Sequence, residues 1–175
     1  MKFYMKLQDW LAGPFSQKMQ KFMQNPYMHA LQVCFTIILP MIMVGSLASL
    51  VNTFRNFAPW LPDLSLINSF SFGLISIFMA FLIPYTIMES KKLQKQKMIT
   101  GFASVSALIA LANPQYVDGN LVINSGYVGT GGMTVAMVMG LVIGWLFSAY
   151  FKHGLFKKDS SLPSVVVVWF ESILI

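Results

Sequence analysis

The feature that most constrains this chain is a long stretch without charge. No Asp, Glu, Lys or Arg lies between His29 and Arg55, and most residues there are apolar. A helix needs about 20 predominantly apolar residues to cross a hydrocarbon core roughly 30 Å thick. Only 10% of the 175 residues are charged and the mean hydropathy is +0.65, whereas soluble domains carry about 25% charged residues. The sequence therefore predicts an all-α integral membrane protein.

The apolar pattern predicts about five transmembrane helices within residues 28–175. They are expected at 30–51, between 63 and 89, and at 98–112, 132–151 and 162–175. The third is short and rich in small residues. The fifth has only about 14 residues, so we expect it to be truncated and the membrane unit to be incomplete. Pro40 and Pro84 fall inside the first two spans and are expected to kink them.

The cations divide unevenly between the two sides of this topology. Arg55 is the only one of the 12 Lys and Arg residues on the side opposite the amino terminus. The others precede span one, or lie between spans two and three or spans four and five: Lys2, Lys6, Lys18, Lys21, Lys91, Lys92, Lys95, Lys97, Lys152, Lys157 and Lys158. The positive-inside rule predicts that the amino terminus is cytoplasmic.

Residues 1–27 form a separate region before the first span. Apolar residues recur there at helical spacing, and Lys, Gln and Asp occupy the other face. Gly13-Pro14 is expected to divide the region into two short helices. We predict amphipathic helices lying on the cytoplasmic leaflet, with lysines near anionic headgroups; plain cytoplasmic helices are the alternative.

The loops on the opposite side of the predicted topology are modest. Trp60 suits the aromatic belt at a membrane surface. Asp118-Gly119-Asn120 favours a tight turn in an exposed segment.

Few residues could carry chemistry. Cys34 is the only cysteine, which excludes a disulfide framework and a cysteine metal cluster. The two histidines have no metal-binding spacing, so we predict neither a metal site nor a cofactor. No basic run with interleaved aromatics indicates a nucleic-acid partner. Because no nucleophile–base pair can be assembled, no catalytic residue is assigned and enzymatic activity stays undecided.

Glu171 is the one candidate functional residue, because it is the only acid inside a predicted span and an ionisable group at that depth is costly. The alternative is that it lies near the far interface or pairs with a group encoded later. For His29, an interfacial position is favoured over a proton relay. Gly129-Thr-Gly131-Gly132 lacks the strand and the Lys-Ser/Thr of a phosphate-binding loop. Gly140 and Gly144 allow close approach of either a neighbouring span or a second protomer.

Four segments carry a family resemblance through their order and spacing. Leu39-Pro-Met-Ile-Met-Val-Gly-Ser46 lies in the first span, and Phe72-Gly-Leu-Ile in the second is followed by Lys91-Lys92-Leu93. A Gly-rich segment, Tyr127–Ala136, leads into the fourth span, and Leu162–Leu174 opens the fifth. Together they resemble the membrane (EIIC) components of bacterial sugar phosphotransferase systems, in the lactose/cellobiose/chitobiose branch. The resemblance covers nearly the whole chain but only the first half of the family's length.

The resemblance implies sugar transport across the bacterial cytoplasmic membrane, coupled to phosphorylation of a β-linked disaccharide such as cellobiose, chitobiose or lactose. This chain would supply the scaffold and dimerisation half of a homodimer. The family's substrate-binding residues are expected in the missing second half, so none is assigned here. The phosphoryl group would come from EIIB, which receives it from EIIA. The alternatives are a truncated, non-transporting scaffold or remnant that only self-associates, and a small channel, which the shortage of polar residues in the spans disfavours.

Overall fold

The computed structural model describes residues 15–152, except the side chains of Gln17 and Lys18. The helices are α2 (Ser16–Met23), α3 (Pro26–Arg55), α4 (Ser65–Phe72), α5 (Ile75–Ser90), α6 (Lys97–Leu111), α7 (Ser125–Val128), the 3-10 turn η2 (Thr130–Gly132) and α8 (Met133–Lys152). Two short strands, β1 (Gln115–Val117) and β2 (Asn120–Val122), complete the described part. The predicted fifth span, Glu171 and the first of the two amino-terminal helices lie outside the described residues.

Within residues 15–152, three helical segments are long and apolar enough to cross a membrane. They are Pro26–Arg55, Ser65–Ser90, which contains a break, and Thr130–Lys152. The helix Lys97–Leu111 is apolar but shorter, about 22 Å at 1.5 Å per residue. The described part is therefore mostly helical, as the sequence predicts, and the predicted ranges of the first four spans all fall largely on helices.

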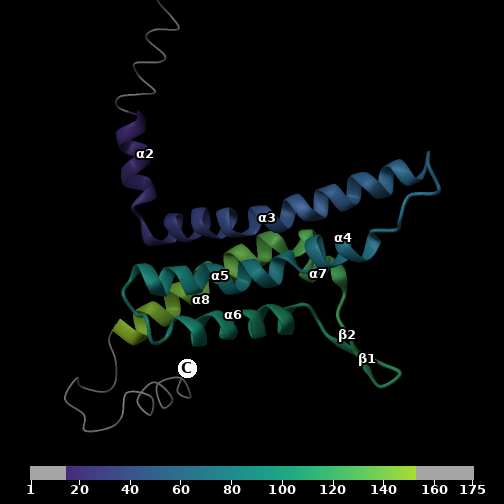
Figure 1. The fold of residues 1–175 in the computed structure, drawn as a ribbon. Coiled ribbons are helices and arrows are strands. Elements are labelled where there is room, and N and C mark those ends of the chain that lie inside the picture. The colour runs from purple at the N-terminus through teal and green to yellow at the C-terminus, as the bar shows by residue number, and fades with distance from the viewer. Residues whose placement is uncertain (1–14, 153–175) are drawn as a thin grey trace, which may run out of the picture.

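Helix α5 is the centre of the bundle. Its side chains pack against α3, α6 and α8, and the largest fully buried ones are Ile75, Met79, Ile83, Ile87 and Met88. In Figure 1, α3 and α6 lie on opposite sides of the layer that α5 and α8 form. Because α5 is covered from several sides, it holds most of the core.

Helix α3 lies at the edge of the bundle. Asn25 caps its first turn by accepting the Tyr27 amide at 3.0 Å, and Pro26 follows at the first helical position. Its 30 residues make it about 45 Å long, more than the roughly 30 Å of a hydrocarbon core. The helix runs on through Pro40, as α5 does through Pro84.

The short amino-terminal helix α2 leaves the bundle sideways at the start of α3 (Figure 1). Two of its apolar residues, Met19 and Phe22, are 48% and 55% exposed. Among the described elements, α2 packs mainly against α3. An exposed apolar stripe of this kind is typical of a helix at a membrane surface.

The strands β1 and β2 form an antiparallel hairpin, in which Tyr116 pairs with Leu121. Asp118 and Gly119 form its tip with φ of 50° and 80°, the left-handed conformations that a two-residue hairpin turn requires. The predicted turn is confirmed, and the strands beside it were not predicted.

Candidate functional site

The second apolar span is broken between α4 and α5, at Gly73-Leu74. A β-carbon on Gly73 would lie 2.1 Å from the carbonyl oxygen of Ser69, so only glycine fits this turn. No side chain caps the start of α5. The helix is therefore interrupted here through backbone geometry, inside a stretch that is apolar enough to count as one continuous span.

The Gly-rich segment before α8 packs directly on this break. A β-carbon on Gly129 would lie 3.1 Å from the carbonyl oxygen of Phe72 and 3.3 Å from the α-carbon of Gly73. The buried hydroxyl of Ser76 donates to the carbonyl oxygen of Gly129. Asn124 shapes the approach by accepting the amide of Gly126 at 2.9 Å, which caps α7. Two segments far apart in the sequence thus interlock through backbone contacts.

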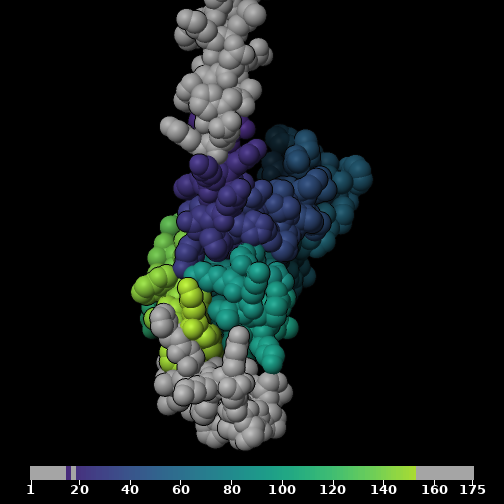
Figure 2. Space-filling view, turned by 90° about the vertical axis from the view of Figure 1, so that its left-hand side faces the viewer, coloured from purple at the N-terminus to yellow at the C-terminus, as the bar shows by residue number. Residues whose placement is uncertain are grey.

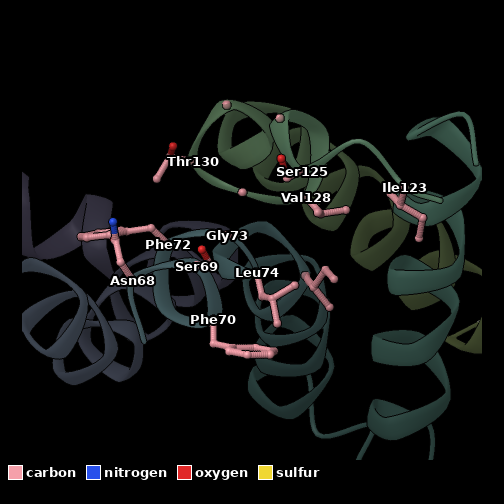
Figure 3. Close-up of a pocket in the computed structure, with 14 residues that line it drawn as sticks. Asn68, Ser69, Phe70, Phe72, Gly73, Leu74, Ile123, Ser125, Val128 and Thr130 are labelled. Carbon is pink, nitrogen blue, oxygen red and sulfur yellow. The ribbon is translucent and has the colours of Figure 1, made fainter. Parts of the chain in front are cut away.

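A pocket of about 610 Å³ lies beside this contact. Figure 3 shows Asn68, Ser69 and Leu74 on the α4–α5 side, facing Ser125 and Thr130 on the α7 side. Among the described residues, those that line the pocket carry hydroxyl, amide and apolar groups and no titratable side chain. Such a lining can hydrogen-bond a neutral hydroxylated molecule or water, but it offers no acid or base.

The opposite end of the bundle is basic. The ammonium group of Lys91, at the end of α5, donates to the Tyr27 hydroxyl of α3 and to the Ser148 hydroxyl of α8, both at 2.7 Å. It also lies 4.6 Å from the centre of the Tyr27 ring. Lys97, at the start of α6, pairs with Glu89 at 2.8 Å. The start of α3, the end of α5, the start of α6 and the end of α8 therefore meet at one end, which Figure 2 views face on.

The far end carries the single arginine. Arg55 pairs with Asp63 at 2.7 Å, and Asp63 also accepts the Ser65 amide at 2.9 Å. The bonds to Ser65 and the pair with Arg55 lower the pKa of the Asp63 carboxyl. The side chain of Asn52 in α3 also holds this loop, because it accepts a hydrogen bond from the Leu64 amide at 2.9 Å. These contacts close the loop that joins α3 to α4.

The structure decides several interpretations that the sequence left open. Gly140 and Gly144 face α5: a β-carbon on Gly144 would lie 2.6 Å from Cδ1 of Ile87 and 3.2 Å from the α-carbon of Pro84. The neighbouring span, not a second protomer, receives this pair of glycines. Gly129 packs on the break in the second span, so this glycine has a packing role.

The remaining predicted residues are scattered. Cys34 is fully buried in the core of the bundle, while His29 is exposed near the start of α3. Within residues 15–152, no group of three or more potential metal ligands comes together. Sequence reasoning missed the break and the Lys91 contacts; the glycine in the middle of the second span was the available signal for the break.

Comparison of the chain with protein-family models, with curated proteins and with solved structures finds no match.

Proposed function

We propose that this chain is the scaffold half of a permease that moves a sugar across the bacterial cytoplasmic membrane and couples its uptake to phosphorylation. The proposed relatives are the EIIC components of the lactose/cellobiose/chitobiose branch. The observation that carries the proposal is the contact between two of the segments on which the resemblance rests. Phe72-Gly-Leu-Ile forms the break in the second span, and Gly129 of the Gly-rich segment packs on it. In secondary transporters, discontinuous helices typically form the substrate and ion sites.

The distribution of charge supports the orientation. The basic residues of the α5–α6 loop lie at the same end as the start of α3, and Arg55 lies at the other end. By the positive-inside rule, this distribution supports a cytoplasmic position for the Lys91 end and the amino terminus. This is also the end at which a phosphorylated EIIB would have to approach.

The proposed role is mechanical. The close packing of α5 against α8 provides a stiff frame, because glycine contacts leave little room for the helices to slide. A sugar-binding unit would move against this frame, binding sugar from outside and presenting a hydroxyl to phospho-EIIB. Sugar recognition is assigned to the second half of the complete permease and phosphoryl donation to EIIB, supplied by EIIA, with the permease acting as a homodimer.

Uptake in the source bacterium tests the proposal. Disruption of the gene should abolish phosphoenolpyruvate-dependent uptake of labelled cellobiose, chitobiose or lactose, and the wild-type gene should restore it. Gly129→Val should not restore uptake, because its side chain would press on the Phe72 carbonyl. Gly119→Asn is the matched control, since it lies in open space with a positive φ that Asn tolerates.

Unchanged uptake of all three sugars after disruption would refute the proposal. A protein of 19.6 kDa in the native membrane that self-associates without EIIB would favour the non-transporting scaffold.

Labelling of introduced cysteines tests the orientation. Cys34 is the only cysteine and is buried, so a cysteine at Lys95 or Trp60 reports its own position. Lys95→Cys should react with an impermeant maleimide only after the cell is opened, and Trp60→Cys should react in intact cells. The reverse pattern would invert the topology.

A further inference from the structure

A groove of about 690 Å³ lies in the corner where α2 leaves α3. Residues of α2, including Met19, Gln20 and Met23, form one wall, and His29 and Gln32 of α3 form the other. The groove is at the basic end of the bundle, away from the pocket at the α4–α5 break. Helix α2 leaves the bundle sideways at this corner (Figure 1).

The walls of the groove carry both hydrogen-bond donors and apolar side chains. Gln20, His29 and Gln32 offer side-chain N–H donors, while Met19 and Met23 offer flexible apolar surface. No Asp or Glu occurs between residue 15 and Asp63. An anion in the groove would therefore meet hydrogen-bond donors and, among the described residues that line it, no carboxylate, within the positive field of the lysines at this end.

The exposed side of α3 continues from the groove toward the middle of the bundle. From His29 to Leu39 the helix rises about 15 Å, half of a roughly 30 Å hydrocarbon core. Along this path the side chains change from polar to apolar, and Phe35 and Leu39 are 40% and 52% exposed. The polarity of this surface changes in the same order as that of one membrane leaflet, from a polar headgroup region to apolar acyl chains.

We propose that this groove binds one anionic phospholipid, with its headgroup between α2 and the start of α3 and an acyl chain along Phe35 and Leu39. The phosphate would accept hydrogen bonds from Gln32 and His29, and Met19 and Met23 would pack on the upper part of the chains. The inference rests on the proposed membrane orientation and is independent of the proposed sugar transport. The bound lipid would fix α2 against α3, which otherwise share few contacts.

Lipid retention by the full chain tests this site. The protein is reconstituted with equal amounts of phosphatidylglycerol and phosphatidylcholine of matched acyl chains, extracted in a mild detergent, and weighed by native mass spectrometry. We expect one phosphatidylglycerol retained in preference to phosphatidylcholine. Gln32→Glu should lower that retention about tenfold, because a carboxylate beside a phosphate repels it at a distance of a few ångströms.

Gln94→Glu is the matched control, because it makes the same change of charge at an exposed position of the α5–α6 loop at the same end. It should leave retention unchanged, and circular dichroism should show equal helix content in both variants. Equal retention of the two lipids, or no effect of Gln32→Glu, would overturn the proposal.

A photo-crosslinking residue at Met19 identifies what occupies the groove. Irradiation in the same vesicles should add the mass of one phospholipid to the chain. A crosslink to residues 1–14 or to a second copy would show that protein fills the groove instead. If the chain is inserted and binds EIIB but shows no lipid preference, this inference alone fails; if it is not inserted in the membrane, both fail.

Discussion

Helices α3 and α5 have similar compositions but differ in how far their large side chains are buried. Both are apolar, and each contains a proline. Met79, Ile83 and Ile87 of α5 are fully buried, whereas Leu47 of α3 is 62% exposed. The buried residues of α3 are mostly small: Ala30, Cys34, Ile38, Gly45 and Ala48. Hydropathy marks both helices as apolar enough for a membrane segment but does not tell which one is the core, because lipid would not penalise an exposed leucine.

The difference in burial depends on which residues of the neighbouring helices lie against each helix. Small residues of neighbouring helices face α5: Gly140 and Gly144 of α8 receive Pro84, and Gly101 of α6 lies against the Phe81 ring. In α3 the small residue belongs to the helix itself and the large one to its neighbour, since Gly45 of α3 lies against the Phe72 ring of α4. Glycines therefore mark the contacts, and the large side chains opposite them fill the core.

Truncating the core of α5 should have the largest effect. Ile83→Ala removes a fully buried side chain and leaves a cavity, so we expect a loss of about 2–4 kcal/mol in the free energy of unfolding. Leu47→Ala on the exposed face of α3 should change it by less than about 0.5 kcal/mol. Unfolding in mixed micelles titrated with dodecyl sulfate measures both. Equal losses would mean that α3 is covered by another part of the assembly.

Enlarging the glycine contact comes next. Gly144→Leu would drive a side chain into Ile87 and Pro84, and we expect it to cost about 1–3 kcal/mol in the same titration. Val142→Leu, at a position of the same helix that is 49% exposed, is the matched control and should be close to neutral. If Val142→Leu were as harmful as Gly144→Leu, the outer face of α8 would have to be a contact surface.

These comparisons show what could be predicted from the sequence. The helix ranges followed from runs of apolar residues, and the hairpin turn followed from Asp118-Gly119, because each depends on local chemistry. Gly73 was a local signal for the break that the apolar run concealed. The direction of Gly140 and Gly144 could not be predicted, because it depends on which residues lie opposite in space. The same holds for Lys91, whose partners Tyr27 and Ser148 are 64 and 57 residues away.

Lys91 offers a test at the basic end. Lys91→Met would remove two hydrogen bonds and the contact with the Tyr27 ring, which join α3, α5 and α8. We expect a loss of about 1–2 kcal/mol in the free energy of unfolding, because hydrogen bonds to a charged group are stronger than neutral ones. Lys95→Met, in the same loop and exposed, should have little effect. A similar loss from both variants would attribute the effect to net charge instead of to the contacts.

The far end should show the smallest effect, visible as a dependence on pH. The bonds from Ser65 and the pair with Arg55 hold the pKa of Asp63 below its ordinary 3.8. The ionised carboxylate therefore contributes stability above that value, and the contribution is lost as pH falls through the lowered pKa. Because both side chains are about half exposed, the effect should be small and weakened by salt.

Asp63→Asn should flatten this acid limb of the melting temperature, measured from pH 7 to pH 2. Asp118→Asn, at the hairpin tip, should leave the limb in place. If Asp63→Asn also left it in place, the loop between α3 and α4 would be held by the Asn52 bond to the Leu64 amide and not by the ion pair.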